Sequence, residues 1–312
     1  MPLPEKALIA RIQNMAGHGR LSLGIGDDAA ILRLPPGHEA LVTTDLSLED
    51  VHFRRDWHPP DSVGHRCLAR GLSDIAAMGG QPIAAFLSLA LPVKLPQAWV
   101  DGFIRGLLKL ARRHKVTLAG GDTAASPSGV MADIIVLGSA PAGNAIRRSG
   151  ARPGDAIFVT GKLGSAAAAL EKLYANPTKR LDLRKYSRHF YPEPRLEVGR
   201  WLARQGVASA MIDLSDGLST DLHHICEESG VGAWIDAERL PREQGTSLDQ
   251  ALNGGEDYEL CFTAPKSRKI RSKIASVLVT QIGEITRSRE VLLLENGKKR
   301  KLERRGWQHF GL

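Results

Sequence analysis

The chain has 312 residues, of which 43% are hydrophobic, 24% are charged and 5% are aromatic. This length allows two α/β domains of ordinary size, and this composition excludes a disordered or fibrous protein. The net charge of +8 favours anionic partners over cationic ones.

Strand and helix signals alternate in the N-terminal half of the chain. We expect strands at residues 40–45, 84–91, 116–119 and 130–137, and helices at residues 61–78 and 97–114. Asp61 and Ser62 can cap the first helix, and Gly79 and Gly80 supply the left-handed exit that helix ends favour. In the second helix the apolar residues recur at helical spacing, so one face packs on a sheet.

A segment rich in Gly, Pro, Ala and Arg, residues 139–155, separates this half from a second αβ pattern. It divides the chain into an N-terminal domain of residues 1–140 and a C-terminal domain of residues 141–312. In the C-terminal domain we expect strands at 156–160, 208–212, 258–263 and 277–285, and a helix at 220–229 that Gly230 ends.

The excess positive charge lies in one stretch. Residues 262–305 hold thirteen Lys or Arg against four Glu, around an expected strand and helix near the C-terminus. A solvated basic face explains this better than nucleic-acid binding, because no recognition motif accompanies the charge.

Two further features bear on compartment. The longest apolar run, residues 83–93, is about half of what a membrane-spanning helix requires. The N-terminal segment, with its acid at Glu5, lacks the pattern of a signal peptide, so we expect a cytoplasmic protein. Cys67, Cys226 and Cys261 are odd in number and widely separated, which fits reduced core residues rather than disulfides or a zinc site.

The acids of the chain that attract attention share one placement. Most of them lie at the end of an apolar strand or in the glycine turn after it, where open α/β sheets bind ligands. They are Asp27, Asp28, Asp45, Asp74, Asp122, Asp213, Asp216, Glu256 and Asp257. Any one of them alone would be a turn residue or a helix cap. So many at similar positions, with glycines beside them, favour a ligand site.

Converging carboxylates repel one another unless cations lie between them. Their hard oxygens suit magnesium, which prefers carboxylate, water and phosphate oxygen. There are no clustered His or Cys ligands for zinc or iron, and we expect His223 and His224, on a predicted helix, to have packing or surface roles. The residues alone therefore predict a magnesium–phosphate site and leave its substrate open.

Two segments match nucleotide-binding motifs only superficially. Gly24-Ile-Gly-Asp-Asp-Ala follows a dinucleotide pattern, but its two adjacent acids would repel a pyrophosphate in the absence of metal. Thr160-Gly-Lys-Leu-Gly-Ser has Leu163 where a phosphate loop needs Ser or Thr after the lysine. Both motifs are excluded.

Nine segments, taken together and in order, identify a family. They are Gly-Asp-Asp-Ala-Ala at 26–30, Thr-Thr-Asp at 43–45, Val-His-Phe at 51–53, Ser-Asp-Ile-Ala-Ala-Met-Gly at 73–79, Gly-Gly-Asp-Thr at 120–123, Arg-Ser-Gly-Ala-Arg-Pro-Gly-Asp at 148–155, Ile-Asp-Leu-Ser-Asp-Gly-Leu at 212–218, Gly-Glu-Asp-Tyr-Glu-Leu at 255–260 and Trp-Gln-His-Phe at 307–310. Over nearly its whole length the chain resembles the thiamine-monophosphate kinases. These belong to the larger group of aminoimidazole ribonucleotide synthetase, selenophosphate synthetase and a hydrogenase-maturation enzyme.

The resemblance implies an activity and a fold. The activity is direct, magnesium-assisted in-line transfer of a phosphoryl group from ATP to thiamine monophosphate, giving ADP and thiamine diphosphate. The fold is α/β (α+β) and has two domains. The N-terminal domain binds ATP and magnesium and forms a β-barrel shared across a homodimer; the C-terminal domain is α/β, and ATP lies between the two.

The resemblance also implies roles for particular residues. Several magnesium ions would be held by Asp27 or Asp28, Thr43, Thr44, Asp45, Asp74, Asp122, Asp213 and Asp216. ATP would contact Gly121, Asp122, Arg148 and Ser215. Thiamine phosphate would meet His52, Glu256 or Asp257, and Trp307. No general base is implied, so catalysis would depend on the metal-holding Asp45, Asp122 and Asp216.

Some alternatives remain open. Trp307 offers a flat face to a cationic thiazolium, an interaction of roughly 0.5–2 kcal/mol, or else it fills the core as a C-terminal aromatic residue. Another enzyme of the same superfamily is a rival, although a selenophosphate synthetase would carry a cysteine near the N-terminal glycine loop, and the first here is Cys67. A non-catalytic nucleotide or nucleic-acid binder with a basic C-terminal surface is the rival from another class.

Overall fold

A computed structural model describes residues 1–17, 19, 21–178 and 180–309. Phe310, the last residue of the ninth signature segment, lies outside these residues. The chain divides into two compact units. The first comprises Met1–Ile75, Gln81–Gly143 and Thr178–Arg180, and the second comprises Ala76–Gly80, Asn144–Pro177 and Leu181–Leu312.

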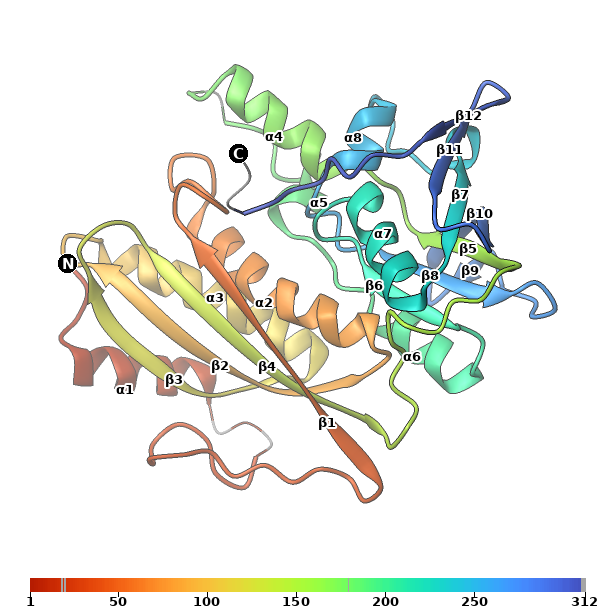
Figure 1. The fold of residues 1–312 in the computed structure, drawn as a ribbon. Helices are drawn as coiled ribbons and strands as arrows, with labels where there is room; N and C mark the ends of the chain where they lie inside the picture. Colours follow the sequence, from red (N-terminus) through yellow and green to blue (C-terminus); the bar gives the residue numbers. More distant parts are fainter. Residues whose placement is uncertain (18, 20, 179, 310–312) are drawn as a thin grey trace. The chain divides into compact units, whose positions relative to one another are not determined.

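The first unit is built on a four-stranded sheet. Its order is β1 (His38–Leu48), β4 (Met131–Pro141), β2 (Gln81–Pro92) and β3 (Thr117–Ser126), as Figure 1 shows. β4 pairs antiparallel with both of its neighbours, and β2 and β3 are parallel. The connection between the two parallel strands is a helix, as such crossovers require.

Helices cover one face of this sheet. They are α1 (Glu5–Ala16), α2 (Pro60–Ala77) and α3 (Gln97–His114). The α3 bounds are those that the apolar spacing predicts, and its side chains Phe103 and Leu107 are fully buried. Gly79, at φ 69°, follows α2 as expected. The sequence signals did not predict α1, because its buried stripe is narrow and consists of Leu8 and Ile12.

The other face of this sheet, which we call the open face, carries exposed side chains of β1 and β4. Side chains alternate along β1, so Leu41 is buried on the helix side whereas Val42 and Leu46 point away. Val42 is 64% exposed, Leu46 is 48% exposed, and Met131 of β4 is 44% exposed. This half of the sheet therefore presents exposed apolar side chains where a solvated face usually carries polar ones, together with the polar Thr44 and Asp133.

The second unit has an eight-stranded sheet. Its order is β12 (Lys298–Lys301), β11 (Val291–Glu295), β7 (Gly232–Asp236), β10 (Val277–Thr286), β5 (Asp155–Thr160), β8 (Leu260–Pro265) and β6 (Ala210–Asp213), with β9 (Lys273–Ile274) paired to β10. Its helical segments are α4 (Ser165–Ala175), α5 (Ser187–Phe190), α6 (Leu196–Gln205), α7 (Leu218–Ser229), η1 (Ala237–Arg239) and α8 (Leu248–Asn253). One apolar core joins the sheet to α7 and α8 through residues such as Ile212, Leu222 and Leu252.

The structure corrects three of the expected elements. β1 and β3 do not end at their aspartates: β1 continues to Leu48 and β3 to Ser126, because both stay hydrogen-bonded to neighbouring strands. The basic run at residues 298–301 is strand β12, and no helix follows α8 among the described residues. Asn296 and Gly297, at φ 49° and 75°, make the tight turn that returns this run along β11.

Two expectations about compartment can be compared with the structure. Cys67, Cys226 and Cys261 are free and buried, as predicted, and burial raises the pKa of the Cys67 and Cys226 thiols to about 12. Among the residues that the structure describes, no helix has the length and apolar character that crossing a membrane requires.

Candidate active site

The first group of acids lies between β1 and α2. Asp45 is in the middle of β1, opposite Ile134, and its side chain is on the helix side of the sheet. There the Thr43 hydroxyl donates to the Asp74 carboxylate from α2, and Arg70 Nε lies 3.7 Å from Asp45 Oδ1. Burial and, after it, the Asp74 charge raise the pKa of Asp45 to about 7 against the opposing charge of Arg70. The site disfavours a second negative charge unless a cation compensates it.

A second group of polar side chains lies on the open face of the same sheet. Thr44 Oγ1 donates to Asp133 Oδ1 at 2.7 Å. The register places Asp133 and Asp122 on either side of Ser88, so both are on this face. Sequence reasoning missed Asp133, although a lone acid within an apolar strand was a signal that could have found it.

Gly121 stands where backbone approaches backbone. Its φ is 147°, and a Cβ there would lie 1.8 Å from the carbonyl oxygen of Leu87 in β2. A side chain at this position would separate β2 from β3 immediately before Asp122, so glycine is needed to place that aspartate.

Asp27 and Asp28 are exposed in the loop after α1. The Asp28 N–H donates to Asp27 Oδ1 at 2.9 Å, and Gln13 of α1 donates to the Ile25 carbonyl at 2.6 Å. Within the described parts of the chain, no contact joins this pair to the other predicted metal residues. The structure thus places them on an anchored surface loop and leaves open which one would hold metal.

The third group of acids is in the second unit, at the junction of β6 and α7. Asp213 ends β6, and Asp216 lies in the loop before α7. Asp221 is buried and accepts the backbone N–H groups of Gly217 at 3.0 Å and Asp216 at 3.3 Å. Burial, with Asp213 and Asp216 nearby, raises the Asp221 pKa well above the usual range for a carboxyl group. Here the acids do gather at a strand end, as predicted.

His224 joins this group from α7. Ligand atoms of Asp216, Asp221 and His224 all lie within 4.8 Å of one another. Burial lowers the pKa of His224, and the nearby charges of Arg148 and Arg304 lower it further, so the imidazole is neutral at pH 7. The sequence indicated only a packing or surface role for His224. Its approach to Asp216 could not be predicted, because only the fold brings the two residues together.

The Gly-Glu-Asp-Tyr-Glu segment is hydrogen-bonded to the loop that holds Asp213 and Asp216. The Glu256 N–H donates to the Ser215 carbonyl at 2.7 Å, and the Tyr258 N–H donates to the Leu214 carbonyl at 2.9 Å. Glu256 and Tyr258 have φ values of 65° and 49°, a conformation that non-glycine residues adopt rarely and that gathers at functional sites.

Between those two residues, Asp257 points toward α4. Its carboxylate accepts the Gly164 N–H at 2.8 Å, just before the helix begins. Burial, with a smaller effect of the Glu259 charge, raises the pKa of Asp257 to about 7 against the Gly164 hydrogen bond, which lowers it. Of the two acids named for substrate, Asp257 holds the start of a helix, and Glu256 remains partly exposed.

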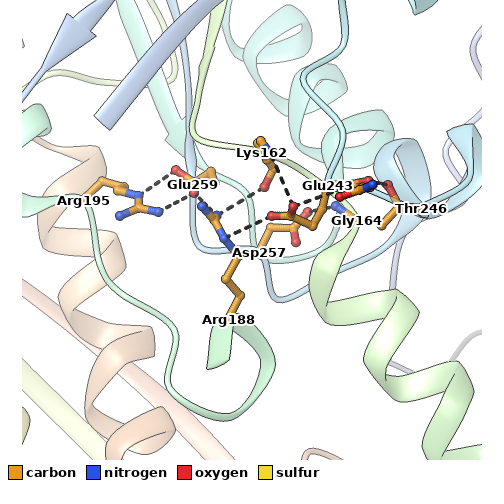
Figure 2. Close-up of polar contacts among 9 residues, drawn as sticks. Lys162, Gly164, Arg188, Arg195, Glu243, Thr246, Asp257 and Glu259 are labelled. Carbon is orange, nitrogen blue, oxygen red and sulfur yellow. Dashed lines mark hydrogen bonds and ion pairs between the residues drawn. The ribbon is translucent and has the colours of Figure 1, made fainter. Parts of the chain in front are cut away.

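Glu259 is the centre of the polar network in Figure 2. Its carboxylate is fully buried and accepts from Arg188 at 2.7 Å, from Arg195 Nε at 2.7 Å, and from the Thr160 hydroxyl at 2.6 Å. Nearer the surface, Lys162 Nζ lies 3.3 Å from Glu243. The network ties the segment of residues 188–195 to strands β5 and β8.

The remaining predicted residues lie beside these groups or in their own turns. The backbone N–H of Trp307 donates to the Asp216 carbonyl at 3.0 Å, and its side chain is 52% exposed, so the alternative in which it fills the core is wrong. Arg148 is close enough to His224 to lower its pKa. His52 Nδ1 accepts the Leu48 N–H at 3.0 Å in the turn after β1, which leaves the proton on Nε2.

Two protein-family models match the chain and indicate the class of protein to which it belongs. The family model described as AIR synthase related protein, N-terminal domain, matches residues 26–140. The model described as AIR synthase related protein, C-terminal domain, matches residues 152–294. The two matches and the two-sheet α/β architecture make the chain an AIR-synthase-related protein.

Relatives narrow the class. The thiamine-monophosphate kinase of Salmonella typhimurium is 38% identical, with 99% of each chain covered. The crystal structure of thiamine-monophosphate kinase from Stenotrophomonas maltophilia K279a has a TM-score of 0.82 at 35% identity and covers 96% of this chain and 98% of that one. The structure of AaThiL complexed with AMPPCP and TMP has a TM-score of 0.79 at 34% identity, covering 93% of each. The chain belongs to the thiamine-monophosphate kinase family.

Proposed function

We propose that this protein is a kinase that transfers a phosphoryl group from ATP to thiamine monophosphate and releases ADP and thiamine diphosphate. The observation that carries the proposal is the 38% identity along 99% of the chain with a thiamine-monophosphate kinase. A family member of 34% identity has been solved with AMPPCP, an analogue of ATP, and TMP bound.

The acceptor determines what the protein has to supply. A phosphate monoester has a second pKa of about 6, so near neutral pH its oxygens are already ionised and no side chain has to remove a proton. The obstacle is repulsion between this dianion and the polyphosphate of ATP. The protein must therefore hold two anions in line and offset their charge, which is what phosphoryl transfer generally demands.

The acid groups fit magnesium. Burial and the nearby Asp74 charge raise the pKa of Asp45, and ligand atoms of Asp216 and Asp221 lie within 4.8 Å of each other. Oxygen donors of this kind are those that magnesium prefers. When bound, magnesium would offset the negative charge of the phosphates. The residues that would hold several such ions are Asp27 or Asp28, Thr43, Thr44, Asp45, Asp74, Asp122, Asp213 and Asp216.

The other site residues orient the two substrates in this proposal. Gly121, Ser215 and Arg148 contact ATP, and the guanidinium of Arg148 attracts its phosphates. Glu256 and Trp307 contact thiamine monophosphate, with the exposed indole against the cationic thiazolium. His52, in the turn after β1, contacts the same substrate in this proposal.

We also propose an assembly and an arrangement of domains. Residues 1–140 form a domain that binds ATP and magnesium, and residues 141–312 form the C-terminal α/β domain. The open, apolar face of the four-stranded sheet pairs with its copy in a homodimer and completes a shared barrel. The exposed Val42, Leu46 and Met131 support this, because patches of that kind mark association surfaces. A cytoplasmic location follows from the reduced cysteines and from the need for ATP.

One incubation tests the function. The protein is mixed with ATP, magnesium and a panel of phosphate acceptors, and ADP and thiamine diphosphate are quantified. We expect ADP release only when thiamine monophosphate and magnesium are both present. Folded protein that makes no thiamine diphosphate with any divalent metal would rule the proposal out. Salt-sensitive binding of an oligonucleotide without turnover would favour the non-catalytic alternative.

A further inference from the structure

The segment before and including Trp307, residues 303–307, crosses the start of α7; we refer to it as the strap. Leu302 anchors it, since its side chain is buried and its N–H donates to the Val291 carbonyl at 2.9 Å. From there the Gly306 N–H donates to Thr220 Oγ1 at 3.1 Å, and the Trp307 N–H donates to the Asp216 carbonyl at 3.0 Å. The strap thus delivers Trp307 to the loop that carries Asp216.

Backbone contacts and one surface ion pair hold the strap: the Arg304 guanidinium donates to the Glu227 carboxylate of α7. Arg305 lies 3.5 Å from Asp249, but both side chains are about two-thirds exposed, so this pair adds little. At Gly306, by contrast, a Cβ would lie 2.5 Å from both the Asp216 carbonyl oxygen and Thr220 Oγ1. The strap therefore approaches α7 as closely as a glycine allows, at the point where Thr220 receives it.

Thr220 is suited to fix the position of the strap. It is 3% exposed, and its own N–H is bound to the Gly217 carbonyl, so its side chain is held in the first turn of α7. Its hydroxyl is the partner of the N–H immediately before Trp307. Without that acceptor, the Gly306 N–H would be left unpaired at a close contact, which destabilises the docked strap relative to a displaced one.

We propose that Thr220 is a positioning residue for substrate recognition: by holding Gly306, it fixes the indole of Trp307 where the cationic heterocycle of the acceptor binds. The inference rests on the proposed function, and goes beyond it in assigning affinity for thiamine monophosphate to a residue that does not contact the substrate. Because Thr220 acts through Trp307, its loss alters binding of the acceptor and leaves binding of ATP unchanged.

The test compares two buried threonines with the same hydrogen bond. Thr263 Oγ1 accepts the Ala210 N–H at 3.1 Å in β8, away from the strap, so Thr263→Val is the matched control for Thr220→Val. Steady-state kinetics and melting temperature are measured for both. We expect Thr220→Val to raise KM for thiamine monophosphate about tenfold, with KM for ATP unchanged and kcat within about twofold of wild type. Thr263→Val lowers the melting temperature by a similar amount and leaves both KM values unchanged.

Fluorescence gives a second readout that needs no turnover. The chain has five tryptophans, so the emission of Trp307 is taken as the difference between a protein and its Trp307→Phe variant. In the Thr220→Val background this difference spectrum should shift to longer wavelength and lose its response to thiamine monophosphate.

The outcomes separate the inference from the function on which it rests. Wild-type kinetics for Thr220→Val, or an equal rise of both KM values, would overturn the inference while the kinase activity stands. An unchanged KM for thiamine monophosphate in Trp307→Ala, which removes the aromatic face, would do the same. Wild-type protein that does not phosphorylate thiamine monophosphate would overturn both.

Discussion

The backbone N–H of Leu214 donates a hydrogen bond of 2.7 Å to the carbonyl oxygen of Glu259. With the bonds from Tyr258 to Leu214 and from Glu256 to Ser215, it joins two segments that are about forty residues apart in the sequence. One segment carries Asp213 and Asp216, and the other carries Glu256. Asp213 and Asp216, proposed for metal, and Glu256, proposed for thiamine phosphate, therefore lie on two segments that backbone hydrogen bonds hold together.

Asp216 is the acid whose removal should be most costly to turnover. We expect Asp216→Asn to lower kcat by about two orders of magnitude or more, because a neutral amide no longer offsets the metal charge, while the far-UV circular dichroism stays that of wild type. Asp182→Asn is the control, since this exposed acid in the same unit accepts the N–H groups of its neighbours Arg184 and Lys185. A wild-type rate for Asp216→Asn at saturating magnesium would remove Asp216 from the metal site.

Asp257 should make the stability of the protein depend on pH. Its folded-state pKa of about 7 is above the 3.8 of an unperturbed aspartate, so between those values the folded protein keeps a proton that the unfolded chain has lost. Its contribution to the free energy of unfolding is then full below about pH 4 and is lost as the pH rises to about 7. We expect the melting temperature of wild type minus that of Asp257→Asn to fall between pH 5 and pH 8. A difference that is constant or grows with pH would contradict the raised pKa.

The buried Glu259 should be a major source of stability. Glu259→Gln leaves the guanidinium of Arg195, whose side chain is 13% exposed, without its charged partner, and we expect a loss of about 3–5 kcal/mol in the free energy of unfolding. Glu243→Gln changes a network neighbour that is 33% exposed and should cost less than about 1 kcal/mol. Urea titrations of the two variants check this, and equal losses would show that burial is not the cause.

The open face of the four-stranded sheet should control assembly. We expect Val42→Arg to convert a dimer to monomers in sedimentation velocity, because residue 42 is exposed on this face opposite the apolar Leu137 and a charge there has no partner in that pair. Leu278→Arg adds the same charge at a leucine that is 51% exposed in the other unit, and should leave the dimer intact. Wild-type protein that sediments as a monomer would exclude the shared barrel.

Local patterns predicted the elements that have strong local causes. The apolar spacing from Val100 to Ala111 gives α3 its bounds, and Gly79 and Gly230 end their helices with positive φ as expected. Helix α1 was not predicted, because only Leu8 and Ile12 of its side chains are buried and two residues make a weak apolar pattern. The sequence predicts strand ends at Asp45 and before Asp122, because acids are uncommon within strands. In the structure both strands continue past the aspartate, because β1 stays paired with β4 and β3 stays paired with β2.

The kind of ligand atom can be predicted from the sequence more readily than the geometry of the site. Acid-rich glycine turns indicate oxygen ligands whatever the fold, so the sequence is enough to propose magnesium. The partners of those acids could not be read from the sequence. Asp221 and His224 lie on a helix whose sequence pattern indicates only which face is buried. Asp133 contacts Thr44 across paired strands, and the two residues are 89 positions apart in the sequence, so no local pattern predicts the contact.

Part of the excess positive charge near the C-terminus lies on strand β12, where it affects how the edge of the sheet can associate with other molecules. β12 is the last strand of its sheet, and all four of its residues, Lys298–Lys301, are exposed. An edge strand with unpaired backbone groups invites the edge of another molecule to add to it, which leads toward aggregates. Four consecutive cations make that approach repulsive for any identical edge, so like charge at the rim keeps the eight-stranded sheet finite.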